Sequence, residues 1–260
     1  MGASPSHDDI IRDQFTRQAS SFAEAPAVRD VEALRILVDA ARVGPDDAAL
    51  DVACGPGIVA CALARVARRV VGVDLTPAMI EKARQLQAEQ GLTNAEFHVG
   101  GVSPLPYRDG EFSVVTCRYA FHHFERPEDV LREMRRVCAP GGTVAVADVA
   151  VSDVHVRALA FNRMERLRDP SHARALTLGE LETLFERAGL PAPQKTFYGF
   201  PFEVEALLAH SSPHPEDVPR IRGMFAESLE GDGLGMRLRR EGNELHGEYP
   251  IVILASTRDG

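Results

Sequence analysis

The stretch ALDVACGPGIVA, residues 49–60, is an apolar run that is interrupted by Gly55, Pro56 and Gly57 and then becomes apolar again. The residues before the glycines are typical of a buried strand, and those after them are typical of a helix. Glycines at such a turn allow the backbone to approach a ligand closely. The stretch therefore predicts a strand, a tight turn and a helix that together form a ligand site.

The same alternation continues on both sides of this stretch. Further apolar runs, expected to be strands, lie at 69–74, 95–100, 112–118 and 143–150, and helical patterns lie between them at 57–67, 77–90 and 127–138. Nearly continuous apolar strands that alternate with helices predict a parallel sheet covered on both faces. Later in the chain we expect a helix over 153–168, a strand over 194–200, helical segments within 202–229, and a hairpin at Gly242-Asn243 that ends in a strand over 250–256.

These elements predict an α/β fold with a doubly wound, Rossmann-like sheet. We expect an N-terminal helical extension over residues 1–42 and one domain over 43–260, with a helical cap inserted at about 151–176 above the ligand side. With 45% hydrophobic and 26% charged residues, the chain has an ordinary globular composition. The net charge of -9 and the lack of a dense Lys/Arg block argue against nucleic acid or an anionic membrane as the main partner. The four cysteines form no CxxC pair, which favours free thiols in the cytoplasm.

The glycine turn has an acidic partner at the end of the next strand. Residues 55–60 match the pattern G-x-G-x-x-A, and Asp74 closes the following strand nineteen residues after Gly55. A carboxylate at that position can bind the two hydroxyls of a ribose. The pattern suits a dinucleotide, as in an NAD(P)-dependent oxidoreductase, and it equally suits S-adenosylmethionine.

The charge beside the turn helps to choose between these two ligands. Asp51 and Cys54 lie immediately before the glycines. A buried carboxylate there would repel a pyrophosphate but would favour the ammonium and sulfonium groups of S-adenosylmethionine. Asp51 could instead be a structural acid that fixes the loop.

Several motifs occur in an order that is typical of one family. The segments ALDVACGPG, VVGVDLTPAMIEKAR, SPLPYRDGEFSVVTCRYAFHHFERPEDVLREMRRVCAPGG and ELETLFERAGL resemble the successive motifs of class I S-adenosylmethionine-dependent methyltransferases. The resemblance spans about residues 8 to 190 and is closest to the ubiquinone/menaquinone-biosynthesis-like small-molecule branch. It implies a seven-stranded sheet with an antiparallel last strand and an N-terminal helix that closes over the cofactor.

The resemblance assigns roles to particular residues. Gly55 and Gly57 would approach the methionine part of S-adenosylmethionine, Asp74 would hold the ribose, and Leu75 would pack on the adenine. Where the family often has an Asp that binds the adenine amino group, this chain has Gly101, although the N–H of Val102 could still donate to the ring. The expected cofactor-binding set is Asp51, Ala53, Cys54, Gly55, Gly57, Asp74, Leu75, Gly101, Val102, Arg118 and Phe22.

The segment RYAFHHF follows the fourth strand, at the sheet edge where ligands bind in such folds. His123 or His122 could act as the general base, or both could serve only to pack or cap the loop. Arg118 could meet the methionine carboxylate, an acidic residue of the lid, or a surface carboxylate. Phe15, Phe22, Phe161, Met164 and residues 197–202 could form an apolar lid, although aromatic residues at helical spacing more often belong to the core. We expect no metal site, and solvent-facing side chains for most of His7, His155, His172, His210, His214 and His246.

The sequence therefore predicts an enzyme that transfers a methyl group from S-adenosylmethionine to carbon or oxygen of a small-molecule metabolite. Two alternatives stay open at this point. One is a protein that binds the cofactor without turnover, which the missing acid at Gly101 suggests, and the other is the oxidoreductase. The sequence does not reveal the acceptor or the oligomeric state.

Overall fold

Residues 49–60 fold as predicted from the sequence. In the computed structural model they form the strand β1 (Ala48–Val52), a turn, and the helix α3 (Ile58–Ala64). The structure describes residues 5–24, 30–211 and 213–260, without the side chains of residues 22–24.

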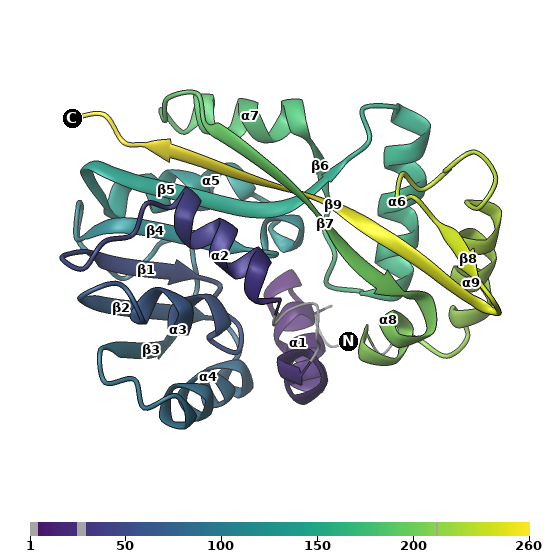
Figure 1. Cartoon of the computed structure of the whole chain (residues 1–260), viewed down its shortest axis with the longest axis horizontal. Helices are drawn as coiled ribbons and strands as arrows, with labels where there is room; N and C mark the ends of the chain where they lie inside the picture. Colours follow the sequence, from purple (N-terminus) through teal and green to yellow (C-terminus); the bar gives the residue numbers. More distant parts are fainter. Residues whose placement is uncertain (1–4, 25–29, 212) are drawn as a thin grey trace.

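One mixed sheet runs through the molecule in the order β3-β2-β1-β4-β5-β9-β7 (Figure 1). The strands from β3 to β5 are parallel, and β9 is antiparallel to both of its neighbours. This arrangement confirms the expected seven-stranded sheet with an antiparallel last strand. Two short strands extend it: β6 pairs with β5, and β8 pairs with β9. The strand bounds are β2 (Arg69–Asp74), β3 (Ala95–Val99), β4 (Phe112–Arg118), β5 (Cys138–Val151), β6 (Leu176–Thr177), β7 (Gln194–Glu203), β8 (Arg239–Glu241) and β9 (Glu244–Thr257).

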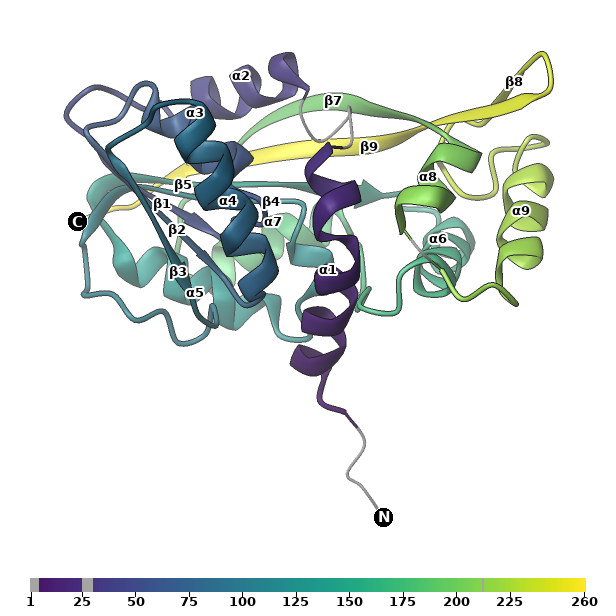
Figure 2. The same ribbon diagram turned by 90° about the horizontal axis from the view of Figure 1, so that it is seen from below.

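Helices cover both faces of the parallel strands (Figure 2). The helices α2 (Val31–Ala40), α3 and α4 (Pro77–Glu89) pack on one face, and α5 (Pro127–Val137) and α7 (Leu178–Arg187) pack on the other. Because successive side chains of a strand point to opposite faces, Leu50 and Val52 join the core beneath α5, whereas Ala49 joins the core beneath α3. Burial on both faces explains the continuous apolar runs.

The strands β5, β7 and β9 continue beyond the parallel sheet into a second lobe (Figure 1). There they share a third apolar core with α6 (His155–Arg168), α8 (Val204–Ser211) and α9 (Val218–Glu227). The helical material expected within 202–229 is thus two helices, α8 and α9. The predicted turn at Gly242 is confirmed, since Glu241 pairs with Glu244 and Gly242 has a φ of 61°.

The helix α1 (His7–Glu24) lies between α4 and α8, at the junction of the two lobes (Figures 1 and 2). Two buried glutamines fix it there, because the side-chain amides of Gln14 and Gln18 both donate to the carbonyl of Ser211, at 3.0 and 2.5 Å. These hydrogen bonds attach α1 to the end of α8 in the second lobe.

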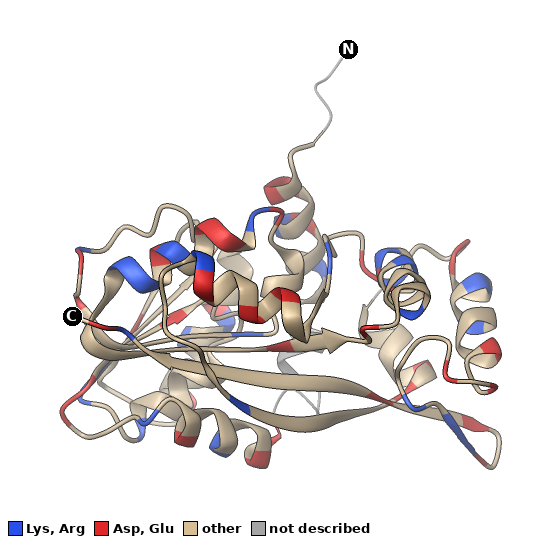
Figure 3. Ribbon diagram, turned by 90° about the horizontal axis from the view of Figure 1, so that it is seen from above, with Lys and Arg blue, Asp and Glu red and all other residues tan. Residues whose placement is uncertain are grey.

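Acidic and basic residues are mixed on the surface and do not form separate patches on the face drawn in Figure 3. On the face drawn in Figure 3, Lys and Arg lie interspersed with Asp and Glu along the helices. Among the described residues, no helix is both long and apolar enough to cross a lipid bilayer.

Candidate active site

Gly55 and Gly57 are each required in the turn, but for different structural reasons. Gly55 and Gly57 have φ values of 51° and 79°, a region that side chains rarely tolerate. A Cβ on Gly57 would lie 2.7 Å from the Cβ of Ala83, so this glycine allows the turn to pack against α4. A Cβ on Gly55 would meet nothing within 4 Å. Gly55 thus borders open space, whereas Gly57 is packed against α4.

Asp74 organises the turn from the end of β2. One carboxylate oxygen accepts a hydrogen bond from the N–H of Gly55 at 2.9 Å, and the other accepts from the N–H of Thr76 at 2.8 Å. Burial raises the pKa of Asp74, and the two backbone donors oppose that rise. Each oxygen still has a second lone pair, so both can accept from ribose hydroxyls as well.

Asp51 presents an unsatisfied acceptor beside this turn. Its side chain is buried, and Oδ1 accepts from the hydroxyl of Thr116 at 2.9 Å. The other oxygen, Oδ2, has no hydrogen-bond partner among the described residues. Burial raises the pKa of Asp51 to about 7, despite the hydrogen bond from Thr116 and the nearby Arg118. A cationic ligand would satisfy Oδ2, whereas a pyrophosphate would be repelled.

These residues line a first cavity of about 320 Å³. Of the predicted cofactor residues, Gly57 does not line it, and the side chain of Phe22 lies outside the described part of the chain. Arg118 is buried here rather than placed on the surface, and its guanidinium lies 4.7 Å from the ring centroid of Tyr119. The predicted residues that do line the cavity are Asp51, Ala53, Cys54, Gly55, Asp74, Leu75, Gly101, Val102 and Arg118.

A second cavity, of about 330 Å³, adjoins the first. Phe15, Tyr119 and His123 line both cavities, so the two cavities meet at these residues. Tyr119 has a φ of 56°, and its hydroxyl is 2.7 Å from that of Tyr198. Of the residues for which a lid or a core position was open, Phe161, Phe200 and Phe202 line this second cavity, whereas Met164 is buried in the core of the second lobe.

His122 forms a pair with Asp148 in the second cavity. The distance from its Nδ1 to Oδ1 of Asp148 is 2.6 Å, and its backbone N–H donates to Oδ2 of Asp148 at 3.3 Å. A carboxylate only accepts, so Nδ1 has a hydrogen, and in the neutral imidazole the lone pair is on Nε2. Burial disfavours the charged imidazole, but Asp148 outweighs this effect and raises the pKa of His122.

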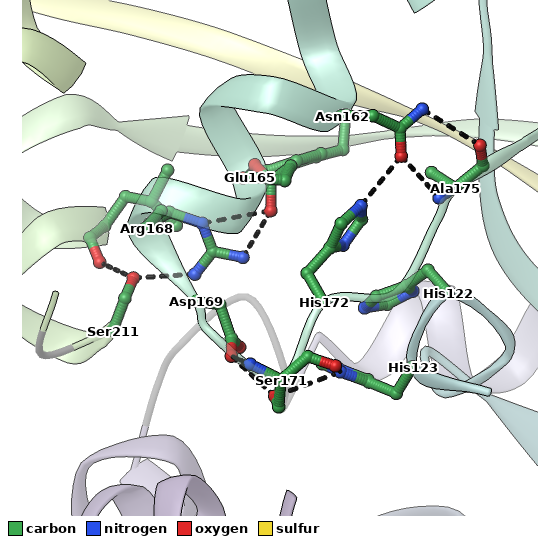
Figure 4. Close-up of polar contacts among 12 residues, drawn as sticks. His122, His123, Asn162, Glu165, Arg168, Asp169, Ser171, His172, Ala175 and Ser211 are labelled. Carbon is green, nitrogen blue, oxygen red and sulfur yellow. Dashed lines mark hydrogen bonds and ion pairs between the residues drawn. The ribbon is translucent and has the colours of Figure 1, made fainter. Parts of the chain in front are cut away.

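His123 is held differently, although its ring centroid is only 4.2 Å from that of His122. Its Nδ1 donates to the carbonyl of Ser171 at 3.0 Å, and the Ser171 hydroxyl donates to Asp169 at 2.5 Å (Figure 4). Its own carbonyl oxygen is 2.7 Å from Nε2 of His7. Burial and the adjacent His122 lower the pKa of His123 to about 4. His123 is thus neutral at physiological pH, with its lone pair on Nε2.

Comparison with known proteins identifies the family. Residues 50–146 match the family model described as a methyltransferase domain. The protein YafE of Escherichia coli is 33% identical over 140 residues, which are 54% of this chain and 68% of YafE. The chain belongs to the class I S-adenosylmethionine-dependent methyltransferases.

Two further relatives support the same assignment. The uncharacterized methyltransferase YcgJ of Bacillus subtilis is 29% identical over 194 residues, 75% of this chain and 77% of YcgJ. Its crystal structure superimposes with a TM-score of 0.82 at 24% identity, covering 88% of this chain and 99% of that one. The structure of BH2331 from Bacillus halodurans gives a TM-score of 0.81 at 25% identity, covering 88% of this chain and all of the other, 100%. The methyltransferase uses S-adenosylmethionine as its cofactor, and the oxidoreductase alternative loses its support.

The residues of the first cavity fit this cofactor. The unpartnered oxygen of Asp51 suits the ammonium group, the lone pairs of Asp74 suit the ribose, and the open space at Gly55 admits a ligand. Gly101 also borders open space, with nothing within 4 Å of a Cβ placed on it. The role of each of these residues stays a prediction, as does the ubiquinone/menaquinone-like branch.

The structure of the methyltransferase adds functional candidates that the sequence analysis missed. Asp148 directly follows Ala147, the last residue of β5 that pairs with β4, and an acid at the carboxyl edge of a strand was the signal that could have revealed it. His172 was expected to face solvent, but it is buried, with Nε2 at 2.8 Å from Oδ1 of Asn162 (Figure 4). The ring centroid of His172 lies 5.5 Å from that of His122, so the two rings pack against each other in the second cavity. No group of three or more His, Cys, Asp or Glu residues in the described part of the chain could hold a metal ion.

Proposed function

We propose that this methyltransferase methylates an oxygen or carbon atom of a small, largely apolar metabolite bound in the second cavity. The observation that supports this most strongly is that Phe15, Tyr119 and His123 line both cavities. A methyl donor in the first cavity and an acceptor in the second would therefore meet beside these three residues. Bound S-adenosylmethionine supplies an already activated methyl group, so most of the remaining catalysis is positioning and exclusion of water.

The protein residues would then handle the proton of the acceptor. We infer that His122 is the general base, since Asp148 fixes its tautomer and leaves the lone pair on Nε2. The raised pKa of His122 makes it a better proton acceptor than His123, whose pKa of about 4 makes it a weak base. During O-methylation the hydroxyl proton of the acceptor would move to Nε2 of His122 as the new carbon–oxygen bond forms and the methyl–sulfur bond breaks, which would leave S-adenosylhomocysteine.

The remaining contacts would hold the two ligands in place. Asp51 and Asp74 would hold the ammonium and ribose groups of the cofactor, and α1 would cover both cavities through Phe15. The hydrogen bonds from Gln14 and Gln18 to the carbonyl of Ser211 would hold this cover in place. Water would thereby be kept from the transferred methyl group.

Label transfer tests this function. The wild-type protein and the Asp148→Asn variant would be incubated with methyl-labelled S-adenosylmethionine and a panel of phenols, quinols and polyketides. We expect a labelled product from at least one acceptor, methylated on oxygen or carbon, with a much lower rate in the variant. Tight cofactor binding without transfer to any member of a broad panel would contradict the proposal and support a binding protein.

A further inference from the structure

The walls of the second cavity are mainly aromatic. The ring of Tyr249 lies 4.9 Å from that of Phe202 and 6.0 Å from each of Phe161 and Phe200, measured between centroids. These rings come from β7, β9 and α6, so three elements present flat apolar surfaces to one space. Such a wall suits a ligand with a ring skeleton of its own.

The charges around the same space are predominantly negative. Arg168 is the one Lys or Arg among the described residues that line the cavity. Its guanidinium is occupied, because Nε and Nη2 donate to Glu165 at 3.1 and 2.5 Å and Nη1 donates to Ser211 at 2.7 Å (Figure 4). The carboxylates that line the cavity are Asp148, Glu165, Asp169 and Glu203. An anionic ligand would face these acids without a free cation to bind it.

Two hydrogen-bond acceptors stand side by side at one end of the cavity. The hydrogen bonds to Asp148 and to the Ser171 carbonyl occupy Nδ1 of His122 and of His123, so in the neutral imidazoles each Nε2 has a lone pair. Neither Nε2 has a hydrogen-bond partner within the described part of the chain, and both side chains line the cavity. With ring centroids 4.2 Å apart, the two acceptors are close enough to bind donors on neighbouring atoms of one ligand.

The two histidines differ in what they can do with those donors. His122, supported by Asp148, can take a proton, whereas His123 remains neutral and can only accept a hydrogen bond. His123 is therefore suited to recognising a second donor that does not react.

Building on the proposed function, we propose that the acceptor has an uncharged ring skeleton with two neighbouring O–H or N–H donors. The reacting donor binds His122, the other binds His123, and acceptors with a carboxylate or phosphate group are rejected. His123 is, on this account, a specificity-determining residue of the acceptor site.

Three small probes separate the parts of this inference. Catechol has two adjacent hydroxyls, guaiacol has one of them methylated, and protocatechuate is catechol with a carboxylate. Their dissociation constants would be measured by calorimetry on protein saturated with S-adenosylhomocysteine. We expect catechol to bind about tenfold more tightly than either of the other two, because each comparison removes one hydrogen bond or adds one repulsive charge.

The His123→Phe variant then tests the assigned residue. It keeps an aromatic ring but removes the lone pair, so the preference for catechol over guaiacol should fall to about twofold or less. His155→Phe is the matched control, because His155 is exposed on α6 and does not line the cavity. The control should keep the wild-type preference.

Three results would overturn the inference. The wild type could bind guaiacol or protocatechuate as tightly as catechol, it could fail to bind catechol at millimolar concentration, or His123→Phe could keep the wild-type preference for catechol over guaiacol. The comparison of catechol with protocatechuate uses only the wild type, so it stands even if the variant does not fold. Methylation of an anionic acceptor would overturn this inference alone, whereas absence of methyl transfer to any acceptor would overturn the proposed function.

Discussion

The imidazole of His122 and the carboxylate of Asp148 are joined by a hydrogen bond of 2.6 Å, although 26 residues separate them in the chain. The histidine follows β4 and the aspartate lies on β5, and these two strands are adjacent and parallel. The carboxyl edge of the sheet therefore brings a base and the group that orients it to the second cavity.

Replacing Asp148 by Asn should lower kcat about hundredfold while leaving the affinity for S-adenosylhomocysteine nearly unchanged. The acidic limb of the pH–rate profile should also move. Asp148 raises the pKa of His122, and a base must be neutral to act, so loss of the carboxylate should shift this limb to lower pH. Asp153→Asn, at an exposed position soon after β5, is the control. An unchanged profile in Asp148→Asn would remove His122 as the base.

Replacing Asp74 by Ala should weaken cofactor binding by about tenfold to a hundredfold, because hydrogen bonds from ribose hydroxyls to a carboxylate are lost. The fold should persist, with far-ultraviolet circular dichroism like that of the wild type. Asp46→Ala, an exposed acid near β1, should bind the cofactor normally. Normal binding by Asp74→Ala would show that the ribose lies elsewhere.

Cofactor binding should depend on pH through Asp51. Burial raises the pKa of this carboxyl to about 7, so it is protonated in the free protein at acidic pH. A cationic ammonium group favours the ionised form, so binding should release a proton, and affinity should rise with pH up to about 7 and then level off. Titrations with S-adenosylhomocysteine in buffers of different ionisation enthalpy would measure that proton. The same pH dependence in Asp51→Asn would contradict this assignment.

Introducing the missing acid should strengthen cofactor binding. Gly101 borders open space in the first cavity, so an Asp side chain fits there without a clash. An added hydrogen bond from the adenine amino group would contribute about 0.5–1.5 kcal/mol, or about two- to tenfold in affinity for S-adenosylhomocysteine. Gly179→Asp adds the same side chain at another open position, on α7, and should change nothing. Weaker binding by Gly101→Asp would place the adenine elsewhere.

The parallel sheet and the first cavity could be predicted from local sequence because their signals are local. The strand, the glycine turn and the acid at Asp74 follow one another within one βαβ unit, and chain connectivity alone brings them together. The second cavity could not be predicted in this way. Its residues come from α1, β5, α6, β7, α8 and β9 and from the segments 119–123 and 169–172. The extension of β5, β7 and β9 beyond the parallel sheet brings these distant parts of the chain together.

His172 shows the same limit at a single residue. It lies in a loop between α6 and β6, a position where solvent exposure is the ordinary expectation. Its burial depends on Asn162, whose side-chain oxygen also accepts from the N–H of Ala175 at 2.7 Å and so holds the loop against α6. No periodic pattern in the sequence indicates such a contact.

A crystal structure with S-adenosylhomocysteine bound tests the central claim most directly. We predict that the ligand occupies the first cavity, with its ribose at Asp74, its ammonium group at Asp51, and its sulfur beside Phe15, Tyr119 and His123, where the two cavities meet. In that position a transferred methyl group would point into the second cavity. A sulfur atom that faces away from these three residues, or a ligand bound outside the first cavity, would contradict the account.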